Sequence, residues 1–295
     1  MKVGIIVPQG WTGEYDGWDA PRAWARTVAL AHETESLGFD SIWMFDHLQT
    51  EPVPTDEITF EAFVTISALA AETARVRLGH LVLCAGYRNP ALVAKMIATL
   101  DVVSGGRAEL GLGAGWKEDE FLAYGWGFPP LRTRMESLED ALEIATRMLR
   151  PGRATYSGPT AEVRDAINVP RGLQEPRIPI LVGGNGPNRT WRLAARFADE
   201  LNLDWFSPGE VLQARPVIDS RCAEIGRDPR TLRVSVNIGR DASAVEGAPR
   251  VDLLRRYVGA GVDRVMTLLR ASAADDGALG RFAEDCVAAG AELEG

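Results

Sequence analysis

The chain has 295 residues, of which 46% are hydrophobic and 25% are charged, and its formal net charge is −9 at pH 7. This composition is ordinary for a globular protein and excludes collagen-like, coiled-coil and largely disordered chains. The acidic balance also argues against nucleic-acid partners and anionic membrane surfaces, because both need a basic face on the protein.

Strand-like runs alternate with helical patterns along the whole chain. The apolar run 3–7 predicts a strand buried on both faces, and residues 21–37 predict a helix that ends before Gly38. Further strands are predicted at 41–45, 76–84, 108–113, 178–184, 200–203, 232–238 and 262–269. Further helices are predicted at 59–73, 90–103, 132–150, 187–197, 208–225, 252–259 and in the tail up to residue 289.

Eight strands, each followed by a helix, predict an α/β fold with a parallel sheet. For a chain of this length, they favour a single (β/α)8 TIM barrel over residues 1–295, and an open doubly wound sheet is the alternative. Residues 151–177 lose the periodicity and contain four prolines. We interpret them as an irregular insertion between the fourth helix and the fifth strand.

Export and membrane insertion are not expected. No run of about 18 apolar residues could span a membrane, and Pro8 ends the first apolar run too early for an export signal. The three cysteines are far apart and form no CxxC pair. This pattern predicts reduced thiols in a cytoplasmic protein, without a disulfide framework or a zinc site.

In a barrel of this kind, functional residues lie where strands end and helices begin. The glycine-rich segment 183–190 has such a position, and its N–H groups and the helix N-terminus after it favour an anion such as a phosphate. A tight turn that only needs glycine dihedral angles is the alternative. The candidate phosphate-binding residues are Gly183, Gly184, Asn185, Gly186, Arg189 and Thr190.

Two other strand ends are rich in small residues. Cys84, Ala85 and Gly86 follow the third predicted strand, and Gly113 and Gly115 follow the fourth. Small side chains there would leave room for a flat ring system across the barrel mouth. Close packing of a strand against a helix, or a core cysteine, would explain the same residues.

His47 lies at the C-terminal edge of the second predicted strand, directly after Asp46. An imidazole there could act as a general acid or base, or could hydrogen-bond a cofactor. A structural hydrogen bond is the alternative. Because no cluster of ligands surrounds this histidine in the sequence, we predict no metal site.

Aromatic residues also gather at the predicted mouth, among them Trp11, Trp116 and Trp205. Several large rings at strand ends favour an apolar or aromatic organic substrate. Burial of these rings under the protein's own lids or in a subunit contact is the alternative.

Four segments, 39–48, 87–116, 132–149 and 178–199, resemble the luciferase-like monooxygenase superfamily. The resemblance is strongest to its branch of oxidoreductases that use the deazaflavin coenzyme F420. It implies a (β/α)8 barrel with a flavin or deazaflavin across its C-terminal mouth, and a homodimer formed through barrel helices.

The resemblance also implies roles for individual residues. Asp46 and His47 would lie beside the cofactor ring. Cys84 and Ala85 would lie under the ring in a bulge of the third strand, where family members often carry a non-proline cis peptide. The residues implied around the cofactor phosphate are Gly183, Gly184, Arg189 and Thr190.

At one position the chain departs from this branch. The sugar-phosphate dehydrogenases of the branch carry an acidic residue after the fourth-strand glycine motif, where this chain has Trp116. Because tryptophan cannot donate a proton as that acid does, we expect a small, apolar substrate. The expected reaction is hydride transfer between F420 and this substrate, with His47 as the polar group nearest the reacting carbon.

Three alternative functions share parts of this pattern. A two-component monooxygenase using FMNH2 would have the same barrel and phosphate loop, and it would need a separate flavin reductase. A non-catalytic barrel could store or sense flavin. An aldolase or isomerase without a redox cofactor would need a lysine or a carboxylate pair at strand ends, for which Lys117 and Glu118–Glu120 are the candidates.

Overall fold

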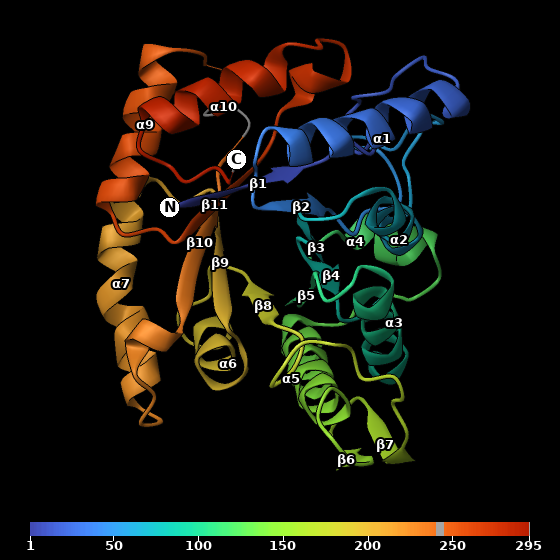
Figure 1. The fold of residues 1–295 in the computed structure, drawn as a ribbon. Coiled ribbons are helices and arrows are strands. Elements are labelled where there is room, and N and C mark those ends of the chain that lie inside the picture. Colours follow the sequence, from blue (N-terminus) through green and yellow to red (C-terminus); the bar gives the residue numbers. More distant parts are fainter. Residues whose placement is uncertain (240–244, 295) are drawn as a thin grey trace.

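The computed structural model describes residues 1–239 and 245–294, which contain a closed barrel of parallel strands (Figure 1). Neighbouring strands pair in chain order around the barrel, and the last one pairs with β1 and closes the ring. The barrel strands are β1 (Lys2–Ile6), β2 (Ser41–Met44), β3 (Arg77–His80), β5 (Ala108–Gly113), β8 (Ile180–Gly183), β9 (Glu200–Asp204), β10 (Arg233–Asn237) and β11 (Arg264–Leu268). The predicted TIM barrel is confirmed.

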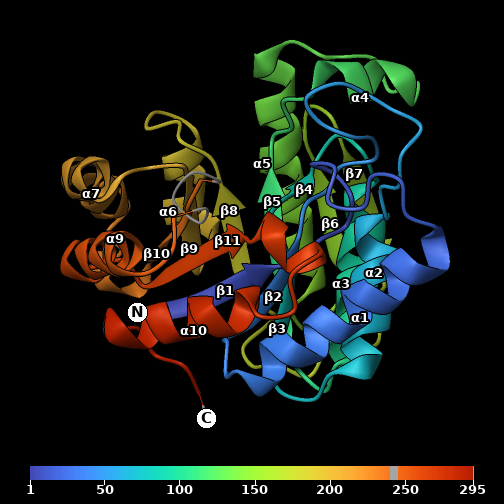
Figure 2. The same cartoon turned by 90° about the horizontal axis from the view of Figure 1, so that it is seen from above.

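Helices surround the barrel on its outside (Figures 1 and 2). The long ones are α1 (Ala20–Ser36), α2 (Ala62–Glu72), α3 (Pro90–Val103), α5 (Leu131–Met148), α6 (Thr190–Phe197), α7 (Pro208–Ala223), α9 (Ala248–Gly259) and α10 (Ala278–Ala288). Short 3-10 helices, η1 (Pro229–Thr231) and η2 (Arg270–Ala273), lie in the connections. Among the described residues, no helix is long and apolar enough to cross a lipid bilayer.

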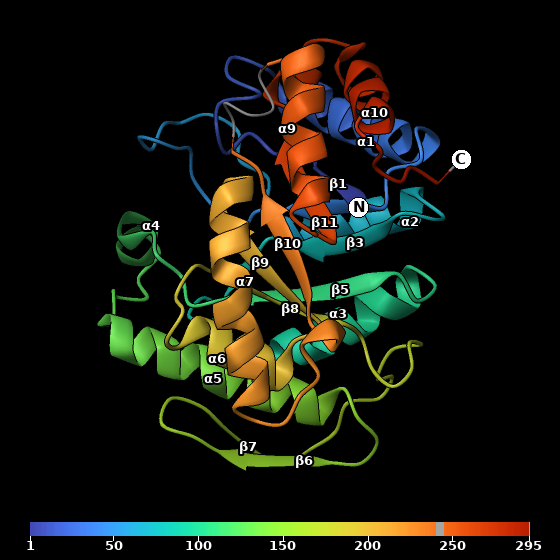
Figure 3. The same cartoon turned by 90° about the vertical axis from the view of Figure 1, so that its left-hand side faces the viewer.

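A short helix and a β-hairpin were not predicted from the sequence. The short helix α4 (Glu118–Ala123) follows β5 and lies at the mouth end of the barrel (Figure 2). The insertion contains an antiparallel hairpin, β6 (Ala154–Ser157) and β7 (Glu162–Ala166), which packs beside α5 (Figure 3). The carboxylate of Asp140 on α5 accepts hydrogen bonds from the hairpin residues 156, 160 and 161. The hairpin is thus held by a contact that sequence periodicity does not reveal.

The third barrel strand is interrupted. β3 ends at His80, and the chain resumes as the two-residue strand β4 (Leu83–Cys84), which pairs with β5. The Leu81–Val82 peptide bond between the two strands is cis. The irregularity therefore lies before Cys84, whereas the resemblance implied it at Cys84 and Ala85.

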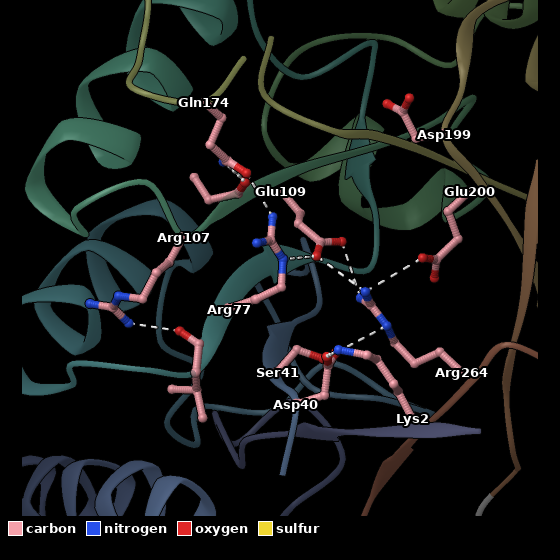
Figure 4. Close-up of polar contacts among 12 residues, drawn as sticks. Lys2, Asp40, Ser41, Arg77, Arg107, Glu109, Gln174, Asp199, Glu200 and Arg264 are labelled. Carbon is pink, nitrogen blue, oxygen red and sulfur yellow. Dashed lines mark hydrogen bonds and ion pairs between the residues drawn. The ribbon is translucent and has the colours of Figure 1, made fainter. Parts of the chain in front are cut away.

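The barrel interior is layered along its axis. Its middle is apolar, with Trp43 fully buried in contact with residues such as Ile6 and Met266. Its closed end is charged, because Arg264 pairs there with Glu109 at 3.1 Å (Figure 4). Arg264 also lies 3.2 Å from an oxygen of Asp40 and 3.5 Å from one of Glu200. We call these four side chains the floor cluster.

Candidate active site

A cavity of about 980 Å³ opens at the C-terminal ends of the barrel strands. Among the residues predicted from the sequence, its wall contains Trp11, Asp46, His47, Cys84, Gly113, Gly115, Trp116, Gly183, Gly184, Asn185, Gly186, Arg189, Thr190 and Trp205. The structure therefore brings together residues that follow most of the barrel strands. A molecule in this cavity would contact several strand–helix loops at once.

Ala85 and Gly86 lie outside this wall. The chain turns outward after Cys84, and the Tyr87 N–H donates to the Cys84 carbonyl. Ala85 packs against the outer core, and a Cβ atom at Gly86 would come within 2.9 Å of the Phe121 ring. The structure thus gives these two residues a packing role.

His47 is held by contacts on its face and on one ring nitrogen. Its ring stacks on Trp11, with 4.0 Å between the ring centroids and 6° between the planes. Nδ1 lies 2.8 Å from Oε2 of Glu120. Trp116 approaches with an edge-to-face geometry at 5.6 Å. These contacts leave Nε2 as the ring nitrogen without a hydrogen-bond partner among residues 1–239 and 245–294.

Glu120, which the sequence offered only as a weak candidate for a different chemistry, is fully buried on α4. Burial would raise the pKa of this carboxyl, but hydrogen bonds from His47, Leu48 and Tyr87 lower it below its ordinary value. Glu120 therefore carries a negative charge at neutral pH. Its contact with His47 was not predicted from the sequence, because α4, the helix that carries it, was not predicted.

Asp46 lines the cavity, but its carboxylate is engaged by the protein. Both oxygens pair with the Arg88 guanidinium, at 2.7 and 2.8 Å, and one also accepts from the Cys84 N–H at 2.8 Å. Arg88 extends this network to Glu61 on the other side. Asp46 thus connects the ends of the second and third barrel strands, and it shapes the wall through these bonds.

The small residues beside β4 are required by packing. Cβ atoms at Gly113 and Gly183 would lie 2.5 and 2.9 Å from methyl carbons of Val82. Val82 thus occupies the space that these glycines leave. Burial raises the pKa of the neighbouring Cys84 thiol to about 12, so this cysteine stays protonated and is a poor nucleophile.

The loop after β8 has the form that an anion site needs. Gly184 has φ +135°, a conformation that glycine adopts without strain. The loop then enters α6, whose first turn leaves backbone N–H groups without helical partners. Arg189 precedes that turn in the cavity wall and makes no ion pair with any residue the structure describes. Asn185 instead braces the loop, because its amide exchanges hydrogen bonds with the backbone of Asp204.

The sequence analysis did not predict the polar side chains that β9 and β10 place in the cavity wall. Asn202 within β9, Asp204 at its end and Asn237 at the end of β10 line the cavity. Asn237 donates to Asp204 at 2.7 Å, and burial raises the pKa of the Asp204 carboxyl despite this bond. A polar residue at the end of an otherwise apolar strand was the available signal in the sequence.

No group of three metal-ligating side chains is present in the part of the chain that the structure describes. The polar groups of the cavity include the imidazole of His47, the arginine Arg189 and a glycine-rich loop suited to an anion. The fold and site thus define a (β/α)8 barrel with a small-molecule site at its mouth.

The chain belongs to the luciferase-like monooxygenase family, whose sequence profile matches residues 1–261. It is 32% identical over 225 residues to the F420-dependent glucose-6-phosphate dehydrogenase of Kineococcus radiotolerans. That match covers 74% of this chain and 65% of the relative, so the chain spans about two thirds of the relative's length.

Solved structures show the same fold. An F420-dependent secondary alcohol dehydrogenase, in complex with an F420–acetone adduct, matches with a TM-score of 0.81 over 98% of both chains, at 18% identity. A monooxygenase from Streptomyces bottropensis matches with a TM-score of 0.75 at 20% identity, over 97% of this chain and 99% of the other.

Proposed function

We propose that this protein is an oxidoreductase that transfers a hydride between coenzyme F420 and a small, apolar organic substrate. One observation carries the proposal. The same cavity is lined by the glycine-rich loop 183–190, which suits an anion, and by an aromatic pocket in which Nε2 of His47 has no partner among the described residues. The similarity to two proteins named as F420-dependent dehydrogenases supports the choice of cofactor.

The residues present fit a phosphate-bearing flat cofactor. Thr190 would hold its phosphate through its hydroxyl, and Arg189 would supply the opposite charge. Gly183 and Gly184 would leave room for the phosphate, since the Gly184 N–H already donates to the Asn202 carbonyl. When bound, a deazaflavin supplies a carbon that accepts or gives up a hydride. The chain would bind and orient this group, exclude water and hold the balancing proton on His47.

The substrate side of the cavity is apolar. Trp11 and Trp116 flank His47, and Trp205 lies across the mouth. Lys117, whose ammonium lies 5.8 Å from the centre of the Trp116 ring, is neutralised by Glu51 at 2.6 Å and Asp119 at 3.0 Å. With no acid at position 116 and no free lysine beside it, this pocket favours an apolar substrate over a sugar phosphate.

The test of the cofactor is fluorescence titration of the purified protein with F420 and FMN side by side. We expect F420 to quench at the lower concentration and reduced F420 to be consumed with small ketones, or oxidised F420 with small alcohols. Tight FMN binding without F420 binding would instead indicate a two-component monooxygenase with its own flavin reductase. Tight binding with no turnover over a broad substrate panel would indicate a non-catalytic barrel.

The test of the imidazole is His47→Ala. We expect turnover to fall by roughly 10²–10⁴-fold, the usual contribution of a general acid or base. His32→Ala is the matched control, because His32 is an exposed residue on α1 whose ring nitrogen contacts the carbonyl and the carboxylate of Glu72, far from the cavity lining. Unchanged turnover in His47→Ala would remove His47 from the mechanism.

We also propose that the protein is a homodimer that uses barrel helices. Val64 on α2 and Leu92 and Val103 on α3 are large, exposed apolar residues on adjacent helices. A second copy would cover them. Light scattering should give a dimer mass for the native chain and a monomer mass for Leu92→Glu; a monomeric native chain would refute this.

A further inference from the structure

The hydrogen bonds around Glu120 determine which nitrogen of His47 can carry a proton. Oε2 of Glu120 faces Nδ1 of His47 at 2.8 Å and receives the Tyr87 hydroxyl at 3.0 Å. Oε1 receives the backbone N–H of Leu48 at 3.0 Å. An ionised carboxylate only accepts hydrogen bonds, so the imidazole must donate through Nδ1.

The imidazole of His47 is also held through a contact on its ring face. Trp11 stacks on the ring with nearly parallel planes and, together with the contact between Nδ1 and Glu120, holds the ring in one orientation. Nε2 therefore faces away from Glu120, toward the cavity that His47 lines. In the neutral ring this nitrogen is left with a lone pair.

We propose that Glu120 is a positioning residue that fixes His47 in the Nδ1–H tautomer, so that Nε2 is the atom that exchanges a proton with the substrate. The inference rests on the proposed function for its chemical meaning. In the oxidising direction, a substrate hydroxyl gives its proton to Nε2 while its carbon loses a hydride to the cofactor. In the reducing direction, the protonated Nε2 returns the proton to the oxygen of the carbonyl that receives the hydride.

Glu120→Gln gives a sharp test because the amide can adopt only one orientation. The Leu48 N–H still needs an acceptor, so the amide oxygen must take the place of Oε1. The amide NH2 then points at His47, and Nδ1 must accept its hydrogen bond. The neutral ring is driven into the Nε2–H tautomer, and the lone pair at Nε2 is lost.

The tautomer is measured by long-range ¹H–¹⁵N correlation on the protein without cofactor or substrate, at a pH where the ring is neutral. The three histidines are assigned with His47→Gln and His32→Gln. We expect Nδ1–H in the native protein and in Glu120→Asp, and Nε2–H in Glu120→Gln. Glu118→Gln, which removes an exposed carboxylate in the same turn of α4, is the matched control and should keep the native tautomer.

With F420 and a substrate, Glu120→Gln should lower kcat by roughly a hundredfold with little change in KM. An Nε2–H tautomer in the native protein would overturn the inference, even if Glu120→Gln failed to fold. An unchanged tautomer in Glu120→Gln would also overturn it. Because the spectrum needs no cofactor, absence of F420 turnover would refute the proposed function and leave the tautomer assignment standing.

Discussion

The two ends of the barrel differ in whether their charged and polar side chains are paired within the protein. At the closed end, the floor cluster gathers Arg264, Glu109, Glu200 and Asp40, all buried and all ion-paired with one another or with neighbouring lysine and arginine side chains (Figure 4). At the mouth, Arg189 and Nε2 of His47 face a cavity without partners among the described residues. The same strands supply both ends.

This difference separates stability from function within one fold. Buried charges are costly unless they are paired, so the pairing within the floor cluster should matter for the stability of the fold. Polar groups left unpaired beside a large cavity are available to a ligand, so the groups at the mouth should matter for ligand binding and for the reaction. Substitutions at the floor should therefore change the free energy of unfolding, and substitutions at the mouth should change affinity or rate.

The largest effect should come from Arg264→Met. Arg264 is almost fully buried and is the one residue of the floor cluster that contacts the other three. Its loss leaves carboxylates without this partner, which costs about 3–5 kcal/mol of unfolding free energy. Urea denaturation measures this cost. Arg164→Met, in an exposed pair with Glu162, is the control and should not shift the midpoint; equal shifts would contradict the comparison.

The next largest effect on the free energy of unfolding should distinguish two carboxylates of the floor cluster, Glu109 and Glu200. Arg264 and Arg77 overcome burial and lower the pKa of Glu109 from 4.5 to about 2, whereas burial raises the pKa of Glu200. A lowered pKa in the folded state gives stability above pH 4.5 that is lost as the pH falls toward 2. For Glu109 this amounts to roughly 3 kcal/mol.

Glu109→Gln should therefore destabilise the protein at pH 7 and flatten the decline of stability below pH 4.5. Glu200→Gln should leave the stability at pH 7 unchanged or higher, because a raised pKa means that ionisation of Glu200 opposes folding there. Denaturation midpoints at pH 7, 4 and 3 distinguish the two. Similar losses for both variants at pH 7 would show that the carboxylates act alike.

The sequence predicted the mouth better than the floor. His47 and the loop 183–190 were found because a strand end is visible in a single chain as an apolar run followed by glycine or polar residues. One partner of Glu109 is Arg264, 155 residues away, and no local pattern joins them. The signal that existed was a charge inside each buried strand, which must find a partner.

The same reasoning explains what was missed within the mouth. Glu120 lies 73 residues from His47 and reaches it from a six-residue helix, which is too short to show periodicity. Asp46 lies in the cavity wall, but its pairing with Arg88 depends on how two strand ends meet. Sequence patterns thus indicate which residues reach the mouth, and only the closed barrel shows how their side chains pair.

Gly184→Ala should have a smaller effect, confined to the anion loop. A side chain at φ +135° costs about 1–3 kcal/mol, and the new Cβ atom would lie 3.2 Å from the Thr190 methyl group. We expect the loop to move and cofactor affinity to fall by roughly tenfold. Gly209→Ala, a helical site with nothing within 4 Å, is the control. Unchanged affinity and stability would show that the loop does not need glycine.

The smallest effect should come from Arg189→Ala, because this side chain is exposed and solvent screens its charge. Loss of one charge-assisted contact to a phosphate should weaken cofactor binding by about tenfold or less at low salt, and by less still at high salt. Arg192→Ala is the matched control, since Arg192 lies three residues further along and pairs with Glu224 at 2.9 Å. Fluorescence titrations at two salt concentrations measure both variants. If Arg192→Ala weakened binding as much as Arg189→Ala, the loss would reflect overall charge, and the unpaired arginine at the mouth would not be a phosphate ligand.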